Sequence, residues 1–221
     1  MRLRKLNDKT YMSEVLRLLK KKYSGQMQTS LHHETPWQLL VATILSAQAQ
    51  DAQVNKITPA LFRDLPNVKE YARIRPTALY KYIGSIGLFR SKAKSIVESA
   101  KIIMNEYHGS VPYTIDELLK LRGVGRKTAN VVLSNAFGTN SGIAIDTHCI
   151  TVANRLGIAR TRNPVKIENR LMSIVPKHDW SNVSHLFIAL GRDVCTARKK
   201  RCGECTLRNI CPSSTAMKRR R

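Results

Sequence analysis

The stretch LRGVGRKTANVVLSNAFG, residues 121–138, is a two-glycine turn followed by an apolar segment with helical spacing. Upstream of it, Thr114 with Glu117 three residues later forms a capping box and predicts a short helix through Lys120. Glycines permit positive φ and a close approach of the backbone, and the free amides that begin the second helix can bind an anion. The stretch therefore predicts a helical hairpin suited to a DNA phosphate, although an ordinary tight turn between packed helices has the same pattern.

Lys127 stands in the first turn of the second predicted helix, two residues after Gly125. A cation there opposes the helix dipole, which gives no stability and tends to depress the pKa of the amine. Such a position is expected where an amine must be neutral to act as a nucleophile. The alternative is a surface lysine that pairs with phosphate, as its neighbour Arg126 can.

Helical spacing of apolar residues extends over nearly the whole chain, and no segment shows a sustained period of two. Helices are expected before Gly25, from Thr35-Pro36 through LLVATIL (39–45), around Ala93–Ala100 with a stop at Gly109, from Asn163-Pro164, and from Ser181 to Gly191. The predicted fold class is all-α.

The charge balance separates this chain from an average globular protein. It has 221 residues, enough to bury one large core or two small ones, and 38 Lys and Arg against 15 Asp and Glu give a net charge of +23. Such an excess indicates a polyanionic partner, most simply nucleic acid, because neutralising phosphates releases counterions. A generally basic surface is the other interpretation.

No apolar run approaches the ~20 residues that a membrane span requires. The opening MRLRKLNDKT (1–10) has basic residues without an apolar core behind them, so no secretory signal is expected. We therefore expect a reducing intracellular compartment, in which clustered cysteines bind metal more often than they form disulfides.

Four of the five cysteines lie in CTARKKRCGECTLRNIC, residues 195–211. Structural zinc sites usually bring two close pairs together, whereas here only Cys202 and Cys205 are close, with Cys195 and Cys211 farther away. Four thiolates without an obvious ligand histidine suit an iron–sulfur cluster, although the spacing differs from ferredoxin-type runs. Spacing alone leaves zinc open.

Asp146 follows a short apolar run in GIAIDTHCITVANR (142–155) that should hold it near the core. A carboxylate there can take a proton from a lysine or stabilise positive charge developing on a sugar. Asp is also a good N-cap for a helix that begins near Thr147, and both roles can hold together. His148 is interpreted as a structural histidine, and Cys149 as a small buried hydrophobe.

Together these motifs resemble endonuclease III, of the helix-hairpin-helix DNA glycosylases. The resemblance extends to LLVATILSAQAQDAQVNK (39–56) and IGLFRSKAKSI (86–96), so it covers nearly the whole chain in the family's order. It implies two helical domains with DNA in the cleft between them. A helical barrel would span residues 29–139, with the helix-hairpin-helix at about 115–137, and residues 1–28 plus 140–221 would form the domain that carries the cluster loop (195–211).

The resemblance further implies a bifunctional DNA N-glycosylase and apurinic/apyrimidinic (AP) lyase that removes oxidised pyrimidines in base excision repair. Lys127 would attack the sugar C1′, release the base, form a Schiff base and promote β-elimination 3′ to the lesion, with Asp146 as its carboxylate partner. Gln48 and Leu88 would enter the helix and fill the space left by the flipped nucleotide. From the residues alone, Leu88 could instead be a hydrophobic staple, and Gln48 could make a helix-terminal hydrogen bond.

For cofactor and partner, the resemblance implies one four-iron four-sulfur cluster and double-stranded DNA that contains damaged pyrimidines or AP sites. The cluster would be held by Cys195, Cys202, Cys205 and Cys211, with zinc as the alternative and no nucleotide cofactor. The predicted DNA contacts, besides Gln48 and Leu88, are Gly123, Gly125 and Arg126 at the hairpin and Arg198, Lys199, Lys200 and Arg201 in a loop that the cluster would make rigid. We expect a monomer in the cytoplasm of a prokaryote, associated with the nucleoid.

Several features distinguish this chain from related classes. Arg122 replaces the proline that is usual before the hairpin glycines, which removes a rigid φ and adds a charge. Residues 38–50 contain no carboxylate, unlike the adenine-excising branch, and Lys127 argues against the branch that acts on mismatched thymine and uracil. Lys127 with Asp146 argues against a non-enzymatic DNA-binding module, and scattered aromatics (6%) argue against a zinc-stapled RNA-binding protein.

Overall fold

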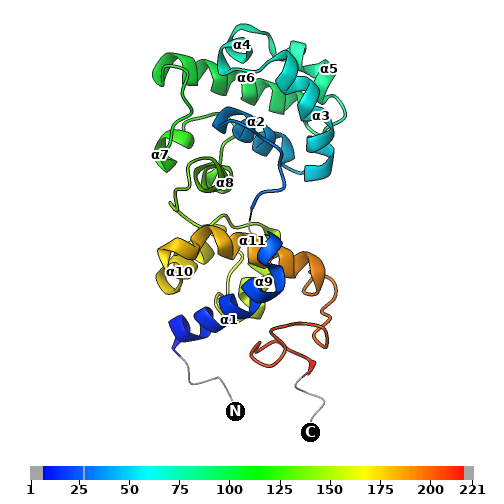
Figure 1. Cartoon of the computed structure of the whole chain (residues 1–221), viewed down its shortest axis with the longest axis vertical. Coiled ribbons are helices and arrows are strands. Elements are labelled where there is room, and N and C mark those ends of the chain that lie inside the picture. Colours follow the sequence, from blue (N-terminus) through cyan, green and yellow to red (C-terminus); the bar gives the residue numbers. More distant parts are fainter. Residues whose placement is uncertain (1–6, 27, 217–221) are drawn as a thin grey trace. The chain divides into compact units, whose positions relative to one another are not determined.

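The computed structural model describes residues 7–26 and 28–216, which fold into helices joined by loops (Figure 1). Within these ranges there is no strand, and an isolated antiparallel bridge joins Cys195 to Lys200. The predicted all-α class is therefore confirmed. The chain divides into two compact units, residues 30–141 and residues 1–29 with 142–221. In the described residues, no helix combines the length and apolar character needed to cross a membrane.

The unit of residues 30–141 is built around a helix that is buried along almost its whole length. Its helices are α2 (Pro36–Ser46), α3 (Asp51–Asp64), α4 (Val68–Arg73), α5 (Tyr80–Ile83), α6 (Phe89–Glu106), α7 (Ile115–Leu118) and α8 (Arg126–Ala136), with a 3-10 turn η3 (Pro76–Leu79). The apolar helix α2 is covered by α3, α6 and α8, and α6 also contacts α4 and α5 (Figure 1). Helix α2 lies at the centre of this unit because its sequence contains no charged residue.

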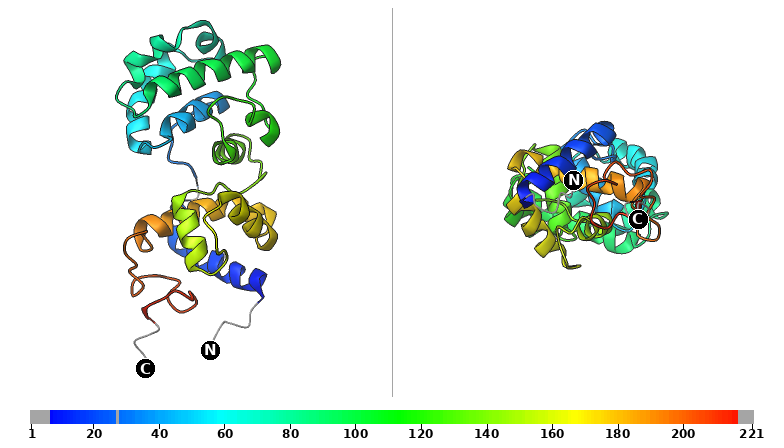
Figure 2. Two further views of the ribbon diagram at one scale, coloured as in Figure 1. Left: turned by 180° about the vertical axis from the view of Figure 1, so that it is seen from behind. Right: turned by 90° about the horizontal axis from the view of Figure 1, so that it is seen from below.

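The second unit brings the N-terminal helix together with the C-terminal half of the chain. Its helices are α1 (Asp8–Tyr23), α9 (Thr147–Arg155), α10 (Pro164–Ile174) and α11 (Trp180–Asp193), with 3-10 turns η2 (Ser24–Gln26) and η4 (Lys177–Asp179). The buried stripe Met12, Val15, Leu16 and Leu19 lets α1 pack on α10 and α11 (Figure 2). This core is separate from the core around α2.

The helix boundaries follow the capping signals in the sequence. Thr35 and Asn163 each accept a hydrogen bond from the amide three residues later, with a proline at the first helical position. Thr114 caps α7 in the same way, but that helix ends at Leu118 rather than at the predicted Lys120. The difference arises because the amides of Lys120 and Leu121 bond carbonyls three residues back, which tightens the chain into turns.

Candidate functional site

The two glycines of the hairpin have different structural roles. Gly123 has a φ of 76°, and a Cβ atom there would lie 2.9 Å from both Cβ and Oγ of Ser95 in α6. Gly125 has an ordinary φ of −97°, and a Cβ there would meet no atom within 4 Å. As the N-cap of α8, Gly125 offers no side chain to the first amides of the helix. A helix that begins without a side-chain cap can bind an anion at its first amides.

Arg122 ties the hairpin to α6. Its Nη1 lies 2.8 Å from Oε2 of Glu98, and its carbonyl oxygen accepts a hydrogen bond of 3.0 Å from Ser99 Oγ. Both charged side chains are partly exposed, so the ion pair itself contributes little stability. On either side of it, the buried Leu121 and Val124 anchor the turn in the core. The hairpin therefore keeps its form without the proline that the family usually has.

Lys127 lies on the solvent-exposed side of α8, and the opposite side of this helix is buried. Ala129, Val132 and Leu133 of α8 face the core against α2, while Lys127 is exposed. Within the described part of its unit, its ammonium group has no hydrogen bond or ion pair. The predicted nucleophile is thus accessible and not used by the fold.

Asp146 belongs to the second unit and caps α9, as the sequence predicts. Its Oδ1 accepts a hydrogen bond of 2.8 Å from the amide of Cys149, and the apolar residues before it, Ile143 and Ile145, are buried. Its Oδ2 has no partner within the described residues of that unit. One carboxylate oxygen therefore holds the helix, and the other is available for chemistry.

The two neighbours of this cap are structural, as expected. His148 packs so closely on α11 that a Cβ atom on Gly191 would lie 2.9 Å from its Nδ1. Cys149 is fully buried. Neither is placed to add a further reactive group to the site.

Gln48 and Leu88 share an unusual backbone conformation. Their φ angles are 56° and 61°, in the left-handed region that non-glycine residues adopt at a cost of about 1–3 kcal/mol. Leu88 is 61% exposed, so it is not a hydrophobic staple. The exposed side chain of Gln48 makes no hydrogen bond with any described residue, so it does not cap a helix end. The fold thus holds both side chains outward.

The four clustered thiols line one cavity. Its walls are formed by Cys195, Cys202, Cys205 and Cys211 together with Arg155, Val194, Lys200, Arg208, Ser213 and Ser214. All four are free thiols. In the part of the chain that the structure describes, no three His, Cys, Asp or Glu side chains converge as ligands of a single ion would. Four thiolates around one cavity can hold either zinc or an iron–sulfur cluster.

The electrostatics of the thiols also fit a shared metal group. Burial raises the pKa of Cys205, and burial with the charges of the other thiols raises the pKa of Cys211 to about 11. Burial acts on Cys202 too, but hydrogen bonds from Thr215 and the charge of Lys200 outweigh it and lower its pKa. Four thiolates that repel one another are stabilised by a metal cation bound between them.

Comparison with known proteins identifies the family of this chain. Residues 41–177 match the HhH-GPD superfamily of base excision DNA repair proteins. Endonuclease III of Synechocystis is 47% identical over 215 residues, which are 97% of this chain and 98% of that protein. Endonuclease III of Escherichia coli is 40% identical over 183 residues, 83% of this chain and 86% of that protein.

The chain belongs to the endonuclease III family of the HhH-GPD superfamily. Two solved structures of endonuclease III agree with its fold, each with a TM-score of 0.88. One is a non-covalent complex with DNA, 39% identical, covering 97% of this chain and all of that chain. The other is a trapped covalent intermediate with DNA, 40% identical, covering 98% of this chain and all of that chain. The predicted family, enzyme class and DNA partner are confirmed.

In this endonuclease III family member, Arg155 organises the start of the basic loop. It is the last residue of α9, and its guanidinium donates to the carbonyl oxygens of Cys195 (2.9 Å), Thr196 (2.8 Å) and Ala197 (3.0 Å). Its Nη1 also lies 3.3 Å from Cys195 Sγ. No pattern in the sequence indicated this role, because a basic residue in the last turn of a helix is common for electrostatic reasons alone.

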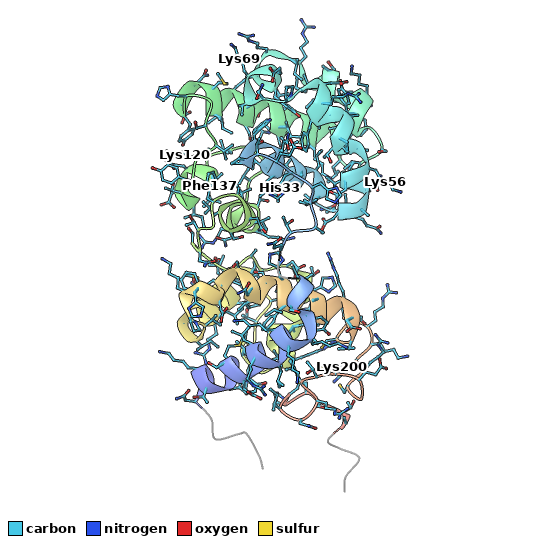
Figure 3. All side chains as sticks on the ribbon, viewed as in Figure 1. His33, Lys56, Lys69, Lys120, Phe137 and Lys200 are labelled. Atoms are coloured by element: carbon cyan, nitrogen blue, oxygen red, sulfur yellow. The ribbon has the colours of Figure 1, made fainter. Side chains whose placement is uncertain are left out.

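The four cations of the loop fall into two pairs. Lys200 Nζ donates to the carbonyl of Ser213 at 3.1 Å (Figure 3 shows Lys200 on this segment), and Arg201 pairs with Asp193 and Glu204 at 3.2 and 3.0 Å. The side chains of Arg198 and Lys199 are exposed and have no partner among the described residues. Two of the four predicted phosphate contacts are therefore engaged in holding the loop, and two are free.

Proposed function

We propose that this chain is a bifunctional DNA N-glycosylase and AP lyase that removes oxidised pyrimidines, with Lys127 as nucleophile and Asp146 as its carboxylate partner. The observation that carries the proposal is an exposed lysine, unused by the fold, in the first turn of the second hairpin helix. The trapped covalent intermediate of a relative 40% identical to this chain supports covalent chemistry of this kind.

The reaction needs a neutral amine at Lys127, because a protonated amine has no lone pair. Asp146, with one oxygen free, is suited to accept a proton or to stabilise positive charge that develops on the sugar. Attack of Nζ on C1′ forms the C–N bond while the bond to the damaged base breaks, and the base leaves with the electron pair and takes up a proton. The nitrogen then loses a proton and the C1′–O4′ bond breaks, with O4′ taking up a proton, so that the sugar ring opens and a protonated Schiff base joins Nζ to C1′. This Schiff base acidifies the C2′ proton. Loss of that proton expels the 3′ phosphate, and hydrolysis of the imine restores the lysine.

We assign DNA binding to three surfaces of the protein. The start of α8 at Gly125, where the N-cap has no side chain, and the exposed cations Arg198 and Lys199 are suited to phosphates. Gln48 and Leu88, held outward, are suited to fill the space of the extruded nucleotide. The net charge of +23 favours binding to the duplex over any neutral ligand.

We assign the four thiols to a four-iron four-sulfur cluster, with zinc as the alternative. Cys195, Cys202, Cys205 and Cys211 would be its ligands, and the group would supply a rigid anchor for the basic loop rather than a step in the reaction. Tyr11 agrees with this assignment. Its buried hydroxyl has no hydrogen-bond partner among the described residues, and burial together with the charge of Cys211 raises its pKa. The hydroxyl is therefore a donor near Cys211 that the protein itself leaves unused. We also infer a monomer that acts in a prokaryotic cytoplasm, with the nucleoid DNA.

Borohydride trapping tests the proposal directly. We expect the parent protein to form a covalent complex with duplexes containing an AP site or an oxidised pyrimidine, because borohydride reduces the Schiff base. Lys127→Ala should lose trapping while it keeps its affinity for the duplex. Lys120→Ala is the matched control, since Lys120 is an exposed lysine just before the same hairpin. Trapping that persists in Lys127→Ala would assign the nucleophile elsewhere and overturn the proposal.

A further inference from the structure

The loops that carry Gln48 and Leu88 are joined by side chains from neighbouring helices. Gln48 lies between α2 and α3, and Leu88 lies between α5 and α6. Both residues have a left-handed backbone conformation, which costs free energy and persists only where the surrounding structure stabilises it. Two hydrogen bonds connect these loops to one another and to the helices beside them, and both come from residues outside the catalytic group.

The first connection is made by Lys92, a lysine of α6 that is only 5% exposed. Its Nζ donates to the carbonyl oxygen of Leu45 at 2.9 Å, three residues before Gln48. Its backbone amide donates to the carbonyl oxygen of Leu88 at 3.0 Å. One residue is therefore bonded through its side chain to the end of α2, just before the Gln48 loop, and through its backbone to Leu88.

The bond to Leu45 completes the C-terminal end of α2. The last four carbonyls of a helix lack partners within it, and no glycine follows α2 to close the end. Local groups serve three of them: Ser46 Oγ bonds Thr43 (3.0 Å), the Ala47 amide bonds Ile44 (3.4 Å) and the Ala49 amide bonds Ser46 (3.0 Å). The fourth, Leu45, depends on Lys92. Lys92 thus pairs a carbonyl at the end of α2, just before the chain turns into Gln48.

Burying a lysine is costly, which argues that the contact is specific. Desolvation disfavours the charged ammonium, and burial lowers the pKa of Lys92. The negative end of the α2 dipole offsets part of this cost. An apolar side chain would fill the same space without the desolvation penalty, but it would leave the carbonyl of Leu45 unpaired.

The second connection is made from α3. Gln53 Nε2 donates to the carbonyl oxygen of Ser85 at 2.8 Å, and Ser85 lies in the turn that leads to Leu88. Gln53 is exposed, so this bond stabilises the fold little. Its effect is to fix the turn before Leu88 to the helix that follows Gln48.

We propose that Lys92, assisted by Gln53, is a positioning residue that locks the Gln48 loop and the Leu88 loop together, so that both side chains enter the DNA helix as one preformed element. The inference rests on the proposed insertion of Gln48 and Leu88 and is independent of the role of Lys127. Preorganisation of this kind reduces the entropy lost when the two loops meet DNA.

Insertion can be measured without cleavage. The probe is a duplex with a tetrahydrofuran analogue of the abasic site and 2-aminopurine opposite it, whose fluorescence rises when it is unstacked. Lys92→Met should lower affinity for this duplex about tenfold, as loss of a hydrogen bond to a charged group does, and reduce the fluorescence change. Affinity for undamaged duplex should not change. Lys92→Arg keeps a donor and should restore most of the response, and Lys101→Met, an exposed lysine on the same helix, should behave as the parent.

Combination with Leu88→Ala separates positioning from a general structural effect. If Lys92 acts through the two loops, Lys92→Met should add little to the loss caused by Leu88→Ala. A general structural effect predicts additive losses and an equal loss on undamaged DNA, and either result would overturn the proposal. Parent-like binding by Lys92→Met would overturn it as well.

If Lys92→Met does not fold, Gln53→Ala decides the question. Its exposed position keeps the fold intact, and we expect a loss of about threefold on the abasic duplex, again not additive with Leu88→Ala. Parent-like binding by this variant would then overturn the proposal.

Trapping keeps this inference apart from the proposed chemistry. At saturating protein, Lys92→Met should still be trapped by borohydride on AP-site DNA. If the parent protein is not trapped, the proposed role of Lys127 as nucleophile is refuted. The fluorescence measurement would still test the positioning role of Lys92. If Leu88→Ala binds the abasic duplex as the parent does, Leu88 does not contribute by insertion. The positioning role of Lys92 would then be refuted as well.

Discussion

Gly123 lies so close to Ser95 of α6 that a Cβ atom on residue 123 would stand 2.9 Å from the Cβ and Oγ of that serine. Its φ of 76° disfavours a side chain as well. Gly125, two residues later, has neither constraint. The fold therefore requires the first glycine of the hairpin. The second is not required by the fold, and we propose that it serves an anion that binds at the start of α8.

Alanine at each glycine should separate these two requirements. We expect Gly123→Ala to lower the free energy of unfolding by about 1–3 kcal/mol, because the methyl group meets Ser95 and the backbone is left-handed. Gly125→Ala should unfold at the parent temperature but bind duplex DNA more weakly. Thermal unfolding and duplex affinity measure the two effects. Equal stability of the two variants would contradict this assignment.

The sequence predicted the elements of this protein better than the connections between them. Capping residues such as Thr35 and Asp146 are local signals, and the structure places both where the sequence predicted. Arg155 and Lys92 could not be found in this way, because their partners lie 40 and 47 residues away and a basic residue on a helix is usually solvated. The left-handed backbone of Gln48 and Leu88 was equally hidden, since non-glycine residues give no sequence signal for it.

The basic loop should contact DNA through two of its four cations. Arg198→Ala with Lys199→Ala should weaken binding to all duplexes and reduce the salt slope by about two, one for each lost phosphate contact. Lys200→Ala with Arg201→Ala should change the slope less, because these side chains are already bonded to Ser213, Asp193 and Glu204. Affinity measured over a salt series tests this. Equal slopes for the two double variants would contradict the division.

Arg155 should be needed to keep the cysteine loop in place. Arg155→Lys replaces a planar fork that reaches three carbonyls by a single point charge, so we expect a looser loop and faster loss of the cluster. Iron content and the broad absorbance near ~400 nm, followed over time in a chelator, measure this. Arg160→Lys, at an exposed position after the same helix, is the control. Equal retention in both variants would refute the role, and a colourless parent with stoichiometric zinc would overturn the cluster itself.

The helix cap made by Asp146 and its proposed role in the reaction can be separated by a pair of substitutions. Asparagine caps a helix about as well as aspartate, so Asp146→Asn should keep the hydrogen bond to the amide of Cys149 and the parent stability. Asp146→Ala should lose about 1 kcal/mol through the missing cap. Both remove the carboxylate and should slow base release by roughly 10²–10⁴ in single-turnover assays, the usual contribution of a group that transfers protons. Because only the alanine variant loses the cap, a slow but stable asparagine variant would assign the rate loss to chemistry. If the asparagine variant releases base at the parent rate, Asp146 acts only as the N-cap of α9.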